Sequence, residues 1–231
     1  MSTTNSNNNQ QKNTDGNIPR ALVKGFVNAA GYGFFRVVQL FRLPHCFMKK
    51  RARQNREFNM SRNVQFPLNG QGMGELKDMR IGMRTFSHSG CGAIATFNAM
   101  SLVGCEPKIE DVVDFYERKG IILYANMGVN PIGVSRYLSE QDVQWKRYSG
   151  KVDWDSCITE GQVAIVLYWW ANAKSFAAHY ITIEKLKDGI RVYNLYNSRD
   201  CAFKYEDIQT FLEAGSYKRI VAMFVIDRKD N

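Results

Sequence analysis

The chain has 231 residues, of which 45% are hydrophobic and 23% are charged, enough for one domain with a full core. This composition excludes collagen, a coiled coil and a chain that is disordered throughout. The formal net charge of +9 comes from the N-terminal part, because residues 1–60 hold ten Lys and Arg against two acids.

Targeting signals and metal motifs are not evident in the sequence. No run of 18 residues is apolar and uncharged, and the polar start lacks the basic end and apolar run of a secretory signal. We therefore expect a cytoplasmic protein, or one exported by a route that the sequence does not reveal. The five cysteines are odd in number and lack paired CxxC spacing, so neither a disulfide framework nor a zinc ribbon is indicated.

The basic N-terminal part divides into two segments. Residues 1–17 are mainly Asn, Ser, Thr and Gln and predict a disordered lead-in. Residues 18–60 mix apolar side chains with Arg and Lys, which predicts a basic amphipathic segment. Residues 18–56 would suit an anionic membrane surface, and the alternative is a helix packed on the domain with its charges in solvent. Nucleic acid is the least favoured partner, because no recognisable binding module accompanies the charge.

Residues 61–231 predict a single domain in which helices precede strands. The Asn- and Gly-rich residues 61–82 predict a surface loop, since they lack the strand and the Lys-Ser/Thr pair of a phosphate-binding loop. Hydrophobic patterns then predict a buried central helix over 91–103, capped by Ser89, and further helices over 108–118 and 131–138. Strand-like segments follow at 162–170, 180–186, 190–197 and 219–227. This order predicts an α+β fold.

A cysteine and a histidine are the candidate pair for chemistry. Cys91 stands at the start of the predicted central helix, where unpaired N–H groups and the helix dipole favour the thiolate. Cysteines in such places have pKa values of about 3.5 to 7.5. His179 lies 88 residues later on a predicted strand, and an imidazole beside the thiol would serve as general base and then as general acid.

The predicted hairpin supplies a third residue to orient the imidazole. A three-residue loop between Leu186 and Ile190, with Gly189 in the left-handed region, would place Asn197 directly opposite His179. Opposed side chains have Cβ atoms about 5 Å apart, so the amide would reach the ring. In this register Asn194 points to the other face, which makes Asn197 the predicted orienting residue. A shifted register would move Asn197 away.

These residues together resemble a known family. The segments SGCGAIATFNAMSLVG, GQVAIVLYWW and AHYITIEKLKDGIRVYNLYNS are similar to the papain-like cysteine peptidases, most closely the compact bacterial branch of double-glycine-leader, bacteriocin-processing peptidases. The resemblance covers about residues 80–227. It implies a papain-like α+β fold, in which a central nucleophile-bearing helix packs on an antiparallel β-sheet. It also implies Cys91 as nucleophile, His179 as base and acid, Asn197 as orienting residue, a peptide or protein substrate, and no cofactor.

One position departs from the family pattern. The family has a Gln six residues before the cysteine, which donates to the oxyanion together with the cysteine N–H, and this chain has Thr85 there. The loss of such a donor raises the activation free energy by about 2.7–4 kcal/mol. The candidate substitutes are Ser87, His88, Ser89 and Gln71. Three functions therefore stay open: a thiol hydrolase, a weak or inactive module that binds a peptide, and an acyl transferase or deamidase.

The remaining cysteines and histidines have simpler interpretations. His88, Cys91 and His179 could supply three zinc ligands, but no fourth ligand can be named, so no metal site is predicted. Free cysteines are among the most buried residue types, and core packing is the interpretation for the others in the domain, which are Cys105, Cys157 and Cys201.

Overall fold

The structure is a computed structural model that describes residues 45–121, 125–172 and 176–228, with the backbone alone at 45–48. The chain divides into two compact units, Met1–Phe41 and Arg42–Asn231, and every described residue belongs to the second. The predicted lead-in and residues 18–44 of the basic segment lie outside the described residues. The predicted boundary between residues 60 and 61 falls inside the second unit and stays a prediction.

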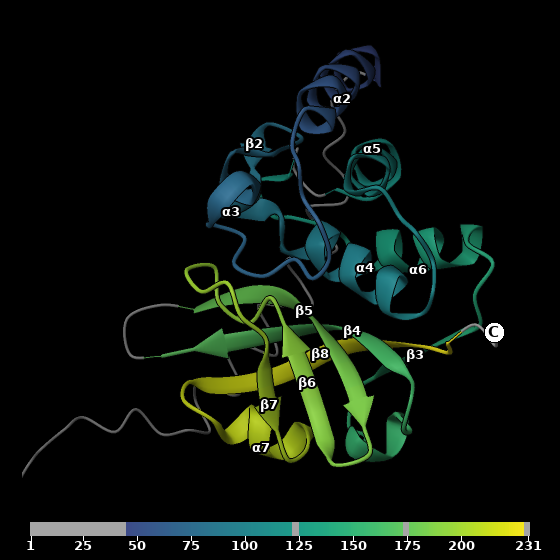
Figure 1. Cartoon of the computed structure of the whole chain (residues 1–231), viewed down its shortest axis with the longest axis vertical. Helices are drawn as coiled ribbons and strands as arrows, with labels where there is room; N and C mark the ends of the chain where they lie inside the picture. Colours follow the sequence, from purple (N-terminus) through teal and green to yellow (C-terminus); the bar gives the residue numbers. More distant parts are fainter. Residues whose placement is uncertain (1–44, 122–124, 173–175, 229–231) are drawn as a thin grey trace, which may run out of the picture. The chain divides into compact units, whose positions relative to one another are not determined.

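A mixed sheet-and-helix architecture confirms the predicted α+β class. The main sheet of the described ranges has six antiparallel strands in the order β3-β8-β4-β5-β6-β7 (Figure 1). They are β3 (Trp145–Ser149), β4 (Val163–Ala171), β5 (Phe176–Leu186), β6 (Gly189–Tyr193), β7 (Phe203–Tyr205) and β8 (Tyr217–Ile226). A small second sheet pairs β1 (Arg80–Ile81) with β2 (Arg84–Thr85).

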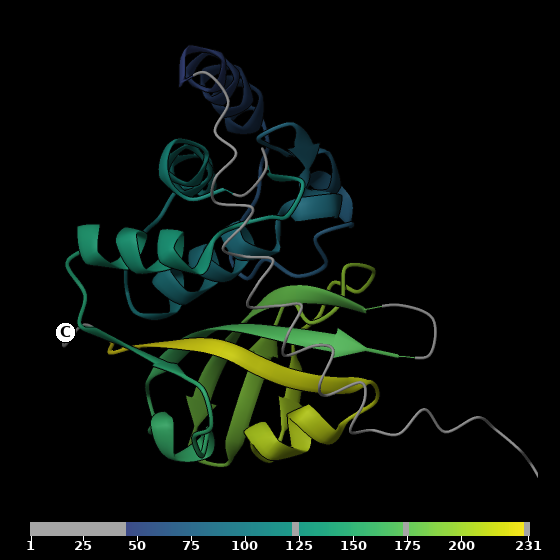
Figure 2. The same cartoon turned by 180° about the vertical axis from the view of Figure 1, so that it is seen from behind.

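Helices cover both faces of the main sheet. The helices of the described residues are α2 (His45–Met60), α3 (Phe86–Ser89), α4 (Cys91–Leu102), α5 (Ile109–Lys119), α6 (Pro131–Glu140) and α7 (Ile208–Glu213), with short 3-10 helices η1 (Gly74–Asp78) and η3 (Asp155–Cys157). The helix α4 lies against one face and α7 against the other, as the two opposite views in Figures 1 and 2 show. None of the helices in the described ranges is long and apolar enough to cross a membrane.

Alternation along the strands creates a core on each face of the sheet. On β4, Val163, Ile165 and Leu167 face the core that contains α4, whereas the residues between them face the core that contains α7. Both sets are buried, which explains why β4 is a continuous apolar run in the sequence.

The central helix forms where the sequence predicts it. Nine consecutive residues of α4, from Gly92 to Met100, are buried, because the helix lies between the sheet and the other helices. The hydroxyl of Thr182 on β5 donates to the carbonyl of Ala95 at 2.8 Å and ties helix to sheet. The prediction that Ser89 caps this helix is wrong. Its hydroxyl donates to the Ala125 carbonyl, and Gly90, in helical conformation, directly joins α3 to α4.

The helix α2 is part of the domain. Asn59 donates to the carbonyl of Arg80 at 2.8 Å and accepts from its N–H at 2.8 Å, which fastens α2 to β1. For residues 45–60 this supports the alternative of a packed helix. Lys49, Lys50 and Arg53 stay exposed, so an anionic membrane surface as a partner stays a prediction.

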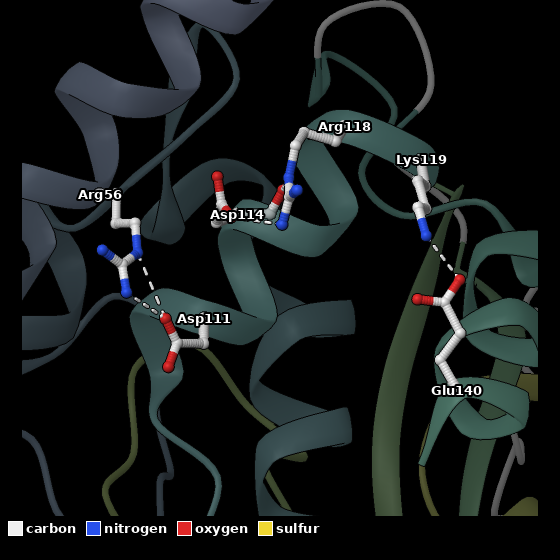
Figure 3. Close-up of polar contacts among 6 residues, drawn as sticks. All are labelled: Arg56, Asp111, Asp114, Arg118, Lys119 and Glu140. Atoms are coloured by element: carbon white, nitrogen blue, oxygen red, sulfur yellow. Dashed lines mark hydrogen bonds and ion pairs between the residues drawn. The ribbon is translucent and has the colours of Figure 1, made fainter.

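Ion pairs connect α5 to the helices on both sides (Figure 3). Arg56 of α2 pairs with Asp111, and Lys119 pairs with Glu140 of α6, whereas Arg118 and Asp114 pair within α5; each N···O distance is 2.6 Å. Because these groups are largely exposed, each pair contributes about 1 kcal/mol or less. The buried side chains of these helices therefore contribute most of the stability.

Candidate functional site

Cys91, the predicted nucleophile, is the first residue of α4 and is half-buried. The backbone N–H groups of Tyr180, Gly92 and Cys91 itself lie near its sulfur and favour the thiolate. Tyr180 directly follows His179 on β5, so the sulfur lies near the backbone at His179. The structure thus brings the backbone of His179 to the predicted nucleophile across 88 residues of sequence.

His179 lies on a part of β5 that has an open edge. This strand pairs with β4 from Phe176 on, but with β6 only from Thr182 on. In the described ranges, the side of β5 toward β6 is therefore without a partner strand from Phe176 to Ile181. The ring of His179 contacts Tyr168, which packs in the core that contains α7, whereas Cys91 packs against the core that contains α4.

The ring of His179 is oriented by a backbone carbonyl. Its Nε2 lies 2.6 Å from the carbonyl oxygen of Asn194. Because a carbonyl oxygen only accepts, Nε2 carries the proton and Nδ1 keeps its lone pair in the neutral ring. The ring of Tyr168 lies edge-on at 5.9 Å between centroids and adds a second contact. This tautomer is the one that a general base needs if Nδ1 is to take the proton.

The predicted register of the hairpin is wrong by one residue. The last pair is Leu186 with Gly189, so the loop has two residues where the prediction has three. The ladder ends at Tyr193, because Asn194 adopts a left-handed φ of 57° and turns the chain away. Asn is one of the few residues that tolerate this conformation, a signal that the sequence already contained.

Asn197, the predicted orienting residue, has a different place. It is exposed, and its backbone carbonyl accepts a hydrogen bond from the N–H of Gly72 at 2.8 Å. The structure therefore places the carbonyl of Asn194 where the prediction places the Asn197 side chain, against the imidazole of His179.

Burial sets the protonation of both reactive groups. It raises the pKa of the Cys91 thiol, although the three N–H groups oppose this effect, so the predicted lowering of that pKa is wrong. Burial also lowers the pKa of His179, with the hydrogen bond to Asn194 opposing it. Both shifts favour the uncharged forms, so the free site holds a thiol and a neutral imidazole rather than an ion pair.

Of the predicted oxyanion donors, Gln71 has the most suitable environment. It is buried, its Nε2 donates to the carbonyl of Ser87 at 3.1 Å, and its Oε1 is buried without a partner. Ser87 lies in α3, four residues before Cys91, so the Gln71 amide sits beside the start of the nucleophile helix. Thr85 is exposed, and its hydroxyl lies 2.8 Å from that of Ser87.

The other cysteines and His88 lie outside this arrangement. Cys105 and Cys157 pack partly against the two cores, which agrees with their predicted role, but Cys201 is exposed, so that prediction is wrong. His88 is exposed on α3. Within the part of the chain that the structure describes, no three His, Cys, Asp or Glu side chains gather as a metal site requires.

Comparison with known proteins adds no assignment. No protein-family model matches the chain, and no curated protein matches it. The chemistry of the site therefore has to be inferred from its own residues.

Proposed function

We propose that the protein is a papain-like thiol hydrolase, which cleaves a peptide or isopeptide bond through an acyl-enzyme on Cys91. The observation that supports this most is the position of the Cys91 sulfur near the backbone N–H of Tyr180, the residue after His179 on β5. A free cysteine at the start of a buried helix, and a histidine with a lone pair on Nδ1 on the strand that packs against this helix, are the parts that nucleophilic catalysis requires.

The proposed reaction starts from the uncharged pair. The thiol proton moves to Nδ1 of His179 as the sulfur attacks the substrate carbonyl, and the Nε2–H bond to the Asn194 carbonyl stabilises the imidazolium that forms. His179 then gives this proton to the leaving amine. In the second half, His179 takes a proton from water, and the resulting attack releases the acid and regenerates the thiol.

Two groups are proposed to stabilise the oxyanion. One is the N–H of Cys91, at the start of α4. The other is the side-chain amide of Gln71, whose Nε2 has a second hydrogen beyond the one donated to Ser87. Gln71 would supply the side-chain amide that the family has six residues before the cysteine, where this chain has Thr85.

A weak or inactive peptide-binding module is the second candidate function. The raised pKa of Cys91 favours it, because a thiol that stays protonated is a poor nucleophile. A transferase or deamidase would use the same residues and would be recognised by its product, such as ammonia released without chain cleavage.

Turnover of peptides tests the proposal. The assay is cleavage of a random heptapeptide library, detected as new termini by mass spectrometry. We expect Cys91→Ala to abolish cleavage and His179→Ala to lower kcat/KM by about 100-fold or more, the usual contribution of a general base. Cys157→Ser, distant from the site, should retain the wild-type rate.

Alkylation separates the hydrolase from the binding module. We expect iodoacetamide to label Cys91 faster as the pH rises, with a rate that drops in His179→Ala. Equal labelling rates in both proteins, together with an uncleaved library, would contradict an activated thiol and favour the binding module.

A further inference from the structure

A short segment, residues 68–72, connects the nucleophile helix to the carbonyl that orients His179; we call it the strap. Its first residue, Leu68, is held by Asn98 of α4, which accepts from the Leu68 N–H at 2.8 Å and donates to the Leu68 carbonyl at 2.7 Å. Asn98 is completely buried. The strap is thus fastened to the helix that begins with Cys91.

The second residue of the strap fixes the backbone of Asn194. Asn69 is only 5% exposed, and its Oδ1 accepts a hydrogen bond from the Asn194 N–H at 2.9 Å. The carbonyl of Asn194 in turn receives the Nε2–H of His179 at 2.6 Å. Two consecutive hydrogen bonds therefore lead from Asn69 to the imidazole.

The side chain of Asn194 does not supply this orientation itself. Its Oδ1 and Nδ2 are buried without a partner. The left-handed conformation of Asn194 is also uncommon for residues other than glycine, and such residues need surrounding contacts to hold them. The hydrogen bond from Asn69 is the contact that holds its N–H.

Close packing keeps the strap in place. Gly70 has a φ of 65°, and a Cβ there would lie 2.9 Å from the Arg199 carbonyl oxygen. The N–H of Gly72 donates to the carbonyl of Asn197 at 2.8 Å. The strap therefore contacts residues 194–199 along its length and has little freedom to shift.

We infer that Asn69 is a positioning residue, which fixes the Asn194 carbonyl so that the ring of His179 keeps its proton on Nε2. Through Asn98 and Leu68 the same strap aligns this carbonyl with the helix of Cys91. The catalytic meaning of this role rests on the proposed function, whereas the tautomer of His179 can be measured without it.

Nitrogen NMR of the full chain with 15N-labelled histidine tests the inference. The chain has three histidines, and the His179 signals are identified by their loss in His179→Ala. We expect the neutral ring of the wild type to be almost entirely the Nε2–H tautomer. In Asn69→Ala we expect a mixture of tautomers and a changed His179 pKa, and in Asn69→Asp, which keeps an oxygen acceptor, the Nε2–H form should persist.

A matched variant separates positioning from general loss of stability. Asn59→Ala removes a buried amide that makes the same kind of backbone contacts, but to Arg80 of β1 instead of to residues 194–199, and should leave the tautomer of His179 unchanged. A wild-type tautomer and pKa in Asn69→Ala, or the same change in Asn59→Ala, would overturn the inference.

The same variants distinguish this inference from the proposed function. If the wild type cleaves the peptide library, Asn69→Ala should lower kcat/KM at least tenfold and shift its pH profile. If the wild type cleaves nothing while Asn69→Ala still loses the tautomer, the proposed function fails and the positioning role stands.

Discussion

A buried carboxyl group under α2 predicts a pH-dependent stability. Glu117 of α5 accepts hydrogen bonds at 2.5 Å from the Asn55 side chain and from the Gly82 N–H, both on Oε1. Glu117 Oε2 and Asn55 Oδ1 are both buried acceptors without a hydrogen-bond partner. A proton on the carboxyl would add a donor to this group of acceptors. Burial raises the pKa of Glu117 to about 7, with Asp114 also raising it and Arg51 lowering it.

The sign and size of the effect follow from this pKa. The folded chain binds the proton more tightly than the unfolded chain, whose carboxyl has the usual value of 4.5. The contribution to stability is therefore complete below pH 4.5 and is lost as the pH rises through about 7. At 1.36 kcal/mol for each unit of pKa, the loss is about 3 kcal/mol. Glu117→Gln keeps the shape and the donor of the protonated carboxyl but does not titrate.

Urea unfolding followed by tryptophan fluorescence measures this effect between pH 4 and pH 8. We expect the difference in unfolding free energy between Glu117→Gln and the wild type to change by about 3 kcal/mol in favour of the variant as the pH rises. Glu140→Gln, at an exposed ion pair, is the control and should change by less than about 1 kcal/mol. A constant difference for Glu117→Gln, or a change of opposite sign, would refute the reasoning.

Two substitutions test the packing of α4 around the site. Gly92→Ala places a Cβ 2.6 Å from the Val129 Cβ, so we expect a loss of about 1–3 kcal/mol in urea unfolding, and an unchanged midpoint would show that this contact can relax. Thr182→Val removes the hydrogen bond to the Ala95 carbonyl at nearly constant shape and should cost about 1 kcal/mol; wild-type stability would mean that the bond is dispensable.

Local patterns in the sequence predicted the longer helices and strands of the domain, but not the short elements α3, α7, β3 and β7. The apolar run from Cys91 predicts α4 to within one residue of its end, and the runs around Val166 and Met223 predict β4 and β8. Such patterns are reliable because each buried face must be apolar at the period of its own element. The same local reasoning predicted that His179 would be on a strand and Cys91 at a helix start.

Tertiary contacts decided the details of the candidate site. The hairpin loop is one residue shorter than predicted, a difference that sequence alone resolves poorly, yet it moves the group facing His179 from Asn197 to the Asn194 carbonyl. The strap that fixes Asn194 is 125 residues away in sequence, so no local pattern reveals it. The pKa of Cys91 likewise depends on burial by the whole fold, which outweighs the favourable N–H groups at the start of its own helix.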